Sequence, residues 1–222
     1  SCPTSPGRQP LGRSCLRDLI RAAICSPLLL AAGVWAEGPL LDDPDMDLAE
    51  RRPWESCLYC HGVGGGAGSE TVPAIAGQSA PYIRKQLADY RSGLRRDPEH
   101  LMSGAAALLD PAQDVLVAAY FADQDVSRIE GRLSPGDDAA GARLFWQGRP
   151  GLVACVACHP PRGRAAPFDY PILDGMSSGY LHRQLQTFRD GRRRNDRAGI
   201  MRRYAESLTE EEILWIVAYL GR

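Results

Sequence analysis

The sequence predicts an all-α protein built from two tandem domains that are related by an internal duplication. When the chain of 222 residues is shifted by 98 positions, many residues of its first half recur in its second half. The matching pairs include Tyr82 with Tyr180, Gln86 with Gln184, Gly93 with Gly191, Arg95 with Arg193 and, after one inserted residue, Met102 with Met201. No stretch alternates apolar and polar residues as a half-buried strand does. Two copies indicate two similar domains and not a solenoid.

Residues 1–36 have the layout of a secretory signal peptide. Four arginines between positions 8 and 21 form a positive region, and residues 22–36 carry no charge and end with the small residues Val34 and Ala36. This uncharged stretch is shorter than the ~20 apolar residues that cross a bilayer. We therefore predict export to the periplasm and removal of the leader. An uncleaved anchor and a buried helix are the alternatives.

Composition and charge indicate a globular protein that does not bind nucleic acid. Hydrophobic residues make up 44% of the chain, charged residues 24%, and the formal net charge is −1, whereas nucleic-acid binding needs a basic surface. The charge is uneven, because residues 37–135 sum to −7 and residues 136–222 to +3. No later apolar run is long enough to cross a membrane. We expect no transmembrane span in the mature chain, and membrane association only through partners.

Each copy of the repeat contains the same predicted helices. A helix over residues 79–93 has Pro81 near its start and Gly93 at its end, and residues 178–191 repeat it. The last helix of each copy begins with a capping box, at Asp110 with Gln113 and at Thr209 with Glu212. The apolar residues that we expect to point inward from these last helices are Val115, Val117, Ala118, Phe121, Ile213, Leu214, Ile216, Val217 and Leu220.

Further helix and linker signals set the domain boundaries. Residues 139–148 predict a first helix for the second copy. The matching stretch before Cys57 is acidic, so we expect the first helix of the first copy to be short or displaced. Pro135 and Gly136 mark a connection. We predict a first domain over residues 37–126, a linker over 127–137 and a second domain over 138–222.

Four of the seven cysteines form two identical motifs. Cys57 and Cys60 are followed by His61, Cys155 and Cys158 are followed by His159, and Cys2, Cys15 and Cys25 lie in the predicted leader. C-x-x-C-H is the attachment motif of haem c. Two cysteines on one helical turn form thioether bonds to the haem vinyl groups, and the histidine ligates the iron. We therefore expect two covalently bound haem c groups. A four-cysteine zinc site, two disulfides and a thioredoxin-like pair are the alternatives, but none explains the histidine after both pairs.

Met102 and Met201 are the candidates for the second axial ligand of each iron. They lie 41 and 42 residues after His61 and His159, in predicted loops just before the last helices. A methionine thioether raises the reduction potential of the haem. The alternatives are that both methionines fill the core, or that His100 replaces Met102. We expect Met46 and Met176 to be packing or surface residues, and His182 to face solvent or a haem propionate.

These motifs together resemble the dihaem class I cytochromes of the cytochrome c4 type, over residues 45–222. The resemblance rests on the doubled C-x-x-C-H, the Pro-x-x-x-Gly segment, the Tyr-x-x-x-Gln-Leu helix with Gly and Arg after it, the methionine and the Ala-Tyr-Leu ending. It implies two all-helical cytochrome c domains with their haems close together. It also implies that the carbonyls of Pro73 and Pro171 accept the ring N–H of His61 and His159 and orient both imidazoles. One departure is that Pro160 follows His159, where the family expects glycine.

The resemblance implies an exported carrier of electrons and not an enzyme. Its two His/Met-ligated haems would exchange electrons with a redox donor and acceptor of the respiratory chain, such as a terminal oxidase or a dehydrogenase. A cytochrome subunit of a larger dehydrogenase or reductase complex is the alternative. A further alternative is a dihaem peroxidase, in which Met102 or Met201 would not be bound to iron.

Eight arginines crowd residues 183–203. They predict a solvated face that is paired with Asp190, Asp196 and the haem propionates. The alternative is a docking surface for an acidic partner or for the first domain.

Overall fold

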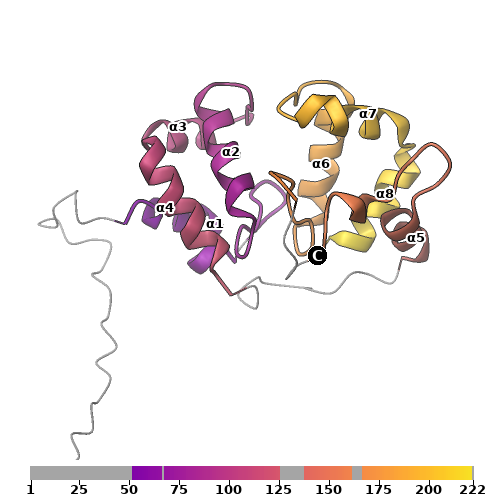
Figure 1. The fold of residues 1–222 in the computed structure, drawn as a ribbon, viewed down its shortest axis with the longest axis horizontal. Helices are drawn as coiled ribbons and strands as arrows, with labels where there is room; N and C mark the ends of the chain where they lie inside the picture. Colours follow the sequence, from indigo (N-terminus) through magenta and orange to yellow (C-terminus); the bar gives the residue numbers. More distant parts are fainter. Residues whose placement is uncertain (1–51, 67, 126–137, 162–166, 222) are drawn as a thin grey trace, which may run out of the picture. The chain divides into compact units, whose positions relative to one another are not determined.

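The structure, a computed structural model, describes residues 52–66, 68–125, 138–161 and 167–221 (Figure 1). These residues belong to one compact unit, Leu41–Arg222. We call residues 52–125 the first lobe and residues 138–221 the second lobe. The predicted signal peptide, the predicted linker, Met46 and the three leader cysteines lie outside the described residues.

The described residues form helices in both lobes and contain no β-strand. The first lobe comprises α1 (Leu58–His61), α2 (Ala80–Arg91), α3 (Leu101–Ala107) and α4 (Pro111–Ala122), with 3-10 helices at Glu55–Cys57 and Val63–Gly65. The second lobe comprises α5 (Ala139–Gln147), α6 (Ser178–Arg189), α7 (Ile200–Ser207) and α8 (Glu210–Leu220), with 3-10 helices at Cys155–Ala157 and Arg197–Gly199. The all-α prediction is confirmed.

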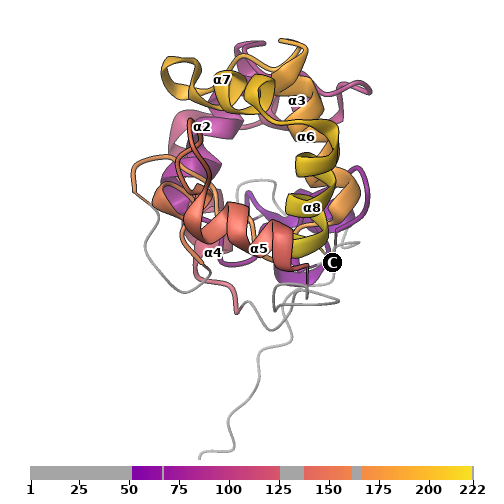
Figure 2. The same cartoon turned by 90° about the vertical axis from the view of Figure 1, so that its right-hand side faces the viewer.

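The two lobes repeat one helix arrangement. α2 packs against α3 and α4, and α6 packs against α7 and α8 in the same way. The second lobe also has α5, which packs against α8 near the C-terminal end of the chain (Figure 2). Trp146 of α5 donates a hydrogen bond of 2.5 Å to the hydroxyl of Tyr219. In the first lobe Trp54 stacks on Tyr120, the residue that matches Tyr219, with ring centroids 4.5 Å apart.

The last helix of each lobe begins at the side-chain cap that the sequence predicts. Both capping boxes are present, at Asp110 and at Thr209. Ser79 and Ser177 cap α2 and α6, because each hydroxyl accepts the backbone N–H three residues on, at 3.4 and 3.1 Å. These caps satisfy backbone donors that have no partner within the helix. Gly93 has a φ of +74° shortly after α2 ends, a conformation that glycine adopts without strain.

Each lobe has its own apolar cluster beside these helices. The buried members are Ile83, Leu87, Val117 and Phe121 in the first lobe, and Phe145, Leu181, Ile213, Ile216 and Leu220 in the second. The inward prediction is wrong for Val115 and Leu214, whose exposed fractions are 44% and 50%. Each follows a buried residue, Asp114 or Ile213, and one residue turns a helix by about 100°, away from the buried stripe.

Charged side chains tie the helices of each lobe together. Asp114 of α4 takes the place that Ile213 has in the second lobe, and it accepts from both terminal nitrogens of Arg91 at 2.7 and 3.0 Å. In the second lobe Glu210 of α8 lies 2.8 Å from His182 and accepts from Gln186 and Arg189 of α6 at 2.7 Å each. The hydrogen bonds from His182, Gln186 and Arg189, in that order, lower the pKa of Glu210 to about 2.

Among the residues that the structure describes, no helix taken alone has the length and apolar character to cross a membrane. α3 and α4 meet that test only as a pair, bent by 118° between them.

α5 approaches α8 so closely that only glycine fits at Gly141. A methyl group there would lie 2.1 Å from the carbonyl oxygen of Trp215 and 2.7 Å from the Cβ of Tyr219. We predict that Gly141→Ala forces α5 and α8 apart and lowers the free energy of unfolding by roughly 1–3 kcal/mol, measured by denaturant titration. Gly104→Ala in α3 is the matched control, because a methyl group there has no atom within 4 Å. The control should gain about 0.5–1 kcal/mol. Equal stability of the two variants would contradict the close approach.

The Glu210 cluster predicts a pH-dependent contribution to stability. The folded pKa of Glu210, about 2, lies below its ordinary value of 4.5, so the contribution is complete above pH 4.5 and is lost as the pH falls towards 2. Glu210 is exposed, so Glu210→Gln should reduce the free energy of unfolding at pH 7 by no more than about 1 kcal/mol. The difference from the wild type should shrink below pH 4. A difference that stays constant from pH 7 to pH 2 would show that the carboxylate charge is not the cause.

Candidate haem sites

A cavity in the first lobe is lined by the whole predicted ligand set of that lobe. Cys57, Cys60 and His61 reach it from the turn around α1, and Met102 reaches it from α3. Apolar side chains complete its walls, namely Ile83 and Leu87 of α2, Leu109, and Val117 and Phe121 of α4. The cavity therefore has the thiols, the imidazole, the thioether and the apolar surface that a covalently held porphyrin needs.

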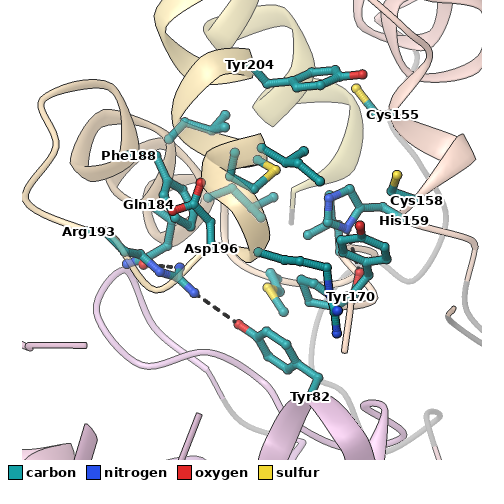
Figure 3. Close-up of a pocket in the computed structure, with 18 of the residues that line it drawn as sticks. Tyr82, Cys155, Cys158, His159, Tyr170, Gln184, Phe188, Arg193, Asp196 and Tyr204 are labelled. Carbon is teal, nitrogen blue, oxygen red and sulfur yellow. Dashed lines mark hydrogen bonds between the residues drawn. The ribbon is translucent and has the colours of Figure 1, made fainter. Parts of the chain in front are cut away.

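The second lobe contains the matching cavity, drawn in Figure 3. Cys155, Cys158, His159 and Met201 line it together. In the figure Cys158 and His159 lie on one side, beside Tyr170, and Arg193 with Gln184 lies on another. The apolar walls are Leu181, Leu185, Ile200, Ile216 and Leu220. Each lobe thus gathers one complete set of predicted haem-binding residues.

Each axial histidine candidate is held by a hydrogen bond to a proline carbonyl. Nδ1 of His61 lies 2.8 Å from the carbonyl oxygen of Pro73, and Nδ1 of His159 lies 2.8 Å from that of Pro171. A carbonyl oxygen can only accept, so Nδ1 carries the proton and Nε2 keeps a free lone pair. Burial lowers the pKa of both histidines, against the opposing effect of these hydrogen bonds. The imidazoles are therefore neutral and able to bind a metal at neutral pH.

The four motif cysteines are free thiols in this structure. Burial raises the pKa of Cys155 to about 11 and raises that of Cys57 as well. The two pairs line different cavities, so they do not form one four-cysteine zinc site. Within the described ranges, no three His, Cys, Asp or Glu side chains converge as a metal cluster. This arrangement does not support the zinc and disulfide alternatives.

The two methionines lie on short helices, which corrects the expectation that they lie in loops. Met102 belongs to α3 and Met201 to α7. An aspartate before each helix orders its first turn, because Asp97 accepts the N–H of Met102 at 3.2 Å and Asp196 accepts that of Arg202 at 3.1 Å. α3 is rich in alanine and has no apolar stripe, so the sequence pattern does not reveal it, whereas in α7 Ile200, Tyr204 and Leu208 recur every four residues and could have revealed that helix. His100 also lines the first cavity, at the cap of α3.

The arginine-rich segment forms ion pairs on its own surface and hydrogen bonds to the first lobe. Arg192 pairs with Asp190, and Arg202 with Asp196, on the surface of the second lobe. Arg183 instead donates to the backbone carbonyls of Glu70 and Thr71 in the first lobe, at 2.6 and 2.9 Å. His182 pairs with Glu210. The segment thus combines a solvated face with contacts to the other lobe.

Several polar residues line the cavities where the lobes meet, and the sequence pattern does not identify them as cavity residues. Tyr82, Gln86 and Arg95 of the first lobe and Tyr180, Gln184 and Arg193 of the second all line one cavity or both. Met176, which is buried, lines both cavities as well. The recurrence of tyrosine, glutamine and arginine across the repeat was the available signal. A repeat shows that positions match, but it does not show that they face the partner lobe.

Comparison with known proteins relates this chain to cytochromes c. The family model described as cytochrome c matches residues 139–222. Cytochrome c4 of Pseudomonas aeruginosa is 36% identical over 168 residues, which cover 74% of this chain and 82% of the relative. Cytochrome c4 of Thiocapsa roseopersicina is 35% identical over 193 residues, which cover 85% and 96%. A protein named thiosulfate dehydrogenase electron acceptor, from Stutzerimonas stutzeri, is 37% identical over 171 residues, which cover 75% and 78%.

Solved structures show the same relationship. The crystal structure of reduced recombinant cytochrome c4 from Pseudomonas stutzeri matches with a TM-score of 0.66 and 32% identity, over 75% of this chain and 93% of that one. The thiosulfate dehydrogenase TsdBA from Marichromatium purpuratum matches with a TM-score of 0.65 and 32% identity. That match covers 74% of this chain but only 36% of the other.

The geometry of the cysteines predicts the outcome of thiol labelling. In the mature protein, unfolded without reductant, an alkylating reagent should label none of Cys57, Cys60, Cys155 and Cys158 if each sulfur is bound to haem as a thioether, as the sequence predicts. Mass spectrometry should find two haem groups on the same chain. Labelling that appears only after reduction would indicate disulfides instead. Labelling by unfolding alone, without haem mass, would indicate a zinc site.

Proposed function

The chain belongs to the cytochrome c4 family, and we propose that it binds each of its two haems through two cysteine thioethers, one histidine and one methionine. Members of this family are dihaem electron carriers, so the protein carries two covalently bound haem c groups and transfers electrons. The proposed ligands are Cys57, Cys60, His61 and Met102 for the first haem, and Cys155, Cys158, His159 and Met201 for the second. The proposed domains are residues 37–126 and 138–222.

One observation carries this assignment: each of two cavities is lined by the same four kinds of side chain, supplied by matching helices. Bound haem supplies one-electron chemistry, as its iron alternates between the ferrous and ferric states. His61 and His159 are oriented for ligation by their proline carbonyls, which also make the imidazoles better electron donors. Met102 and Met201 would add a soft ligand that favours ferrous iron.

The protein chain itself holds the redox groups and excludes water, and it makes no bonds to a substrate. Apolar side chains of α2, α4, α6 and α8 line both cavities, so the surroundings of the iron are of low polarity. A low-polarity site disfavours the extra positive charge of the ferric state and raises the reduction potential. Both effects, the thioether and the apolar walls, support a carrier that works at high potential.

We place this carrier in the periplasm, where it would meet its redox partners. The positively charged and then uncharged layout of residues 1–36 supports export.

A more specific role as the electron acceptor of a thiosulfate dehydrogenase is favoured by one of the similar proteins, which bears that name. Mixing the reduced dehydrogenase with the oxidised cytochrome in a stopped-flow instrument tests this role. Haem reduction that is slow and independent of dehydrogenase concentration would argue for another donor.

The ligand assignment predicts the outcome of an optical redox titration of the mature protein. Wild type should show two low-spin haems of high potential and the absorption band of a methionine–iron bond. Met102→Ala and Met201→Ala should each remove about half of this band. Each should also lower one potential by on the order of 0.1 V or more, because axial ligands set the potential.

Met176→Leu is the matched control for this titration. Met176 is buried and lines both cavities, yet it is not a proposed ligand, so the band should persist in the variant. A band of undiminished intensity in Met102→Ala would contradict ligation by Met102. If His100→Ala then converted the first haem from low spin to high spin, its two axial ligands would be His61 and His100.

A further inference from the structure

A buried arginine lies where the lobes meet and has no acidic partner. Arg95 has an exposed fraction of 5% and lines the first cavity. It donates to Gln86 Oε1 at 2.7 Å, to the hydroxyl of Tyr180 at 2.8 Å and to Gln184 Oε1 at 3.2 Å. All three acceptors are neutral, and two belong to the second lobe.

Arg193, which matches Arg95 in the repeat, has the mirrored environment. It is half-buried and lines both cavities. It donates to Gln184 Oε1 of its own lobe at 2.6 Å, and it lies 3.5 Å from the hydroxyl of Tyr82 in the first lobe, as Figure 3 shows. It also lies 3.4 Å from Gln86 Oε1. Each glutamine therefore accepts from both arginines, so the two guanidinium groups share one hydrogen-bond network.

The positive charge of this network is not neutralised by the described residues. Other arginines form ion pairs with carboxylates, namely Arg91, Arg149, Arg189, Arg192, Arg197 and Arg202. Arg95 and Arg193 form none across the described ranges. The nearest acid in the network, Asp89, is reached through Asn195 and is already paired with Lys85. A buried charge without a counter-charge is costly, so such a site calls for an anion.

The tyrosines of the network respond to the same excess charge. Burial alone would raise the pKa of Tyr82, but the charges and hydrogen bonds of Arg95 and Arg193 together outweigh it and hold that pKa below its ordinary value. By contrast, burial raises the pKa of Tyr90 to about 12, although Arg95 opposes it. The local potential is therefore positive at Tyr82, between the two cavities.

We propose that Arg95 and Arg193 bind the propionate carboxylates of the two haems. Every haem carries two propionates, and these would bring the missing negative charge to the walls where the arginines lie. The planar guanidinium group can donate two parallel hydrogen bonds to a carboxylate, which a lysine cannot. Because the arginines share Gln86 and Gln184, the network joins the two propionate sites. This inference rests on the two bound haems of the proposed function and adds the residues that hold their anionic edges.

The test compares Arg95→Gln and Arg193→Gln with the wild type by redox titration from pH 5 to pH 8. Loss of a cation beside the haem favours the ferric state, so each variant should shift the ferric–ferrous equilibrium by about tenfold. That corresponds to a fall of about 59 mV for one electron. A propionate without its arginine also has a higher pKa, so reduction should take up a proton, and the potential should fall more steeply with pH than in wild type.

Matched controls separate charge from structure. Arg149→Gln removes an arginine that pairs with Glu212 and lines neither cavity, so it should leave both potentials unchanged. Arg95→Lys keeps the charge, so its potentials should lie closer to those of the wild type than to those of Arg95→Gln. Tyr180→Phe removes a hydrogen bond from Arg95 without changing its charge, and it should not steepen the pH dependence. An equal steepening in Tyr180→Phe would show a structural effect and overturn the proposal.

The proposal is also overturned if Arg95→Gln and Arg193→Gln leave the potentials and their pH dependence unchanged while both haems stay low-spin. If the glutamine variants do not fold, Arg95→Lys and Arg193→Lys decide, because a loss of potential at constant charge would contradict the charge argument. Failure of the ligand assignment is distinguishable, because it would appear as a missing methionine–iron band in the unmodified protein.

Discussion

Each lobe is organised around a cavity instead of a filled core, and this constraint governs the rest of the structure. In each lobe the turn that carries two cysteines and a histidine lies across a cavity from a helix that carries a methionine. The apolar side chains of α2 and α6 line these cavities and do not fill them. A lobe of this size has little apolar surface to bury. A large, flat, covalently held group therefore completes the core, which fits an aromatic content of only 7%.

The contacts between the lobes are polar and specific. The side-chain amide of Gln78 exchanges two hydrogen bonds of 2.9 Å with the backbone of Ile172, and Ser177 donates to the carbonyl of Ser69 at 2.7 Å. Such contacts fix one relative position, since a shift of a few ångströms would leave buried polar groups without partners. The duplication placed the same residue types on both sides of the contact between the lobes. The two sides are not identical, because the repeat position occupied by Gln78 in the first lobe is occupied by Met176 in the second.

Local chemistry explains which features the sequence could predict. Capping residues and terminal glycines give helix ends to within two residues, and the doubled C-x-x-C-H locates both haem sites. Three features depend on packing that local pattern does not encode. Met102 lies on a short helix without an apolar stripe, Val115 and Leu214 turn outward by one residue, and Arg95 owes its role to contacts with the other lobe.

Proton NMR of the reduced mature protein tests whether each lobe holds one haem between a histidine and a methionine. A methionine bound to haem iron places its methyl group over the porphyrin ring, where the ring current shifts the resonance far upfield. We expect two such methyl resonances, one lost in Met102→Ala and the other in Met201→Ala. A spectrum with one upfield methyl resonance, or with none, would contradict it.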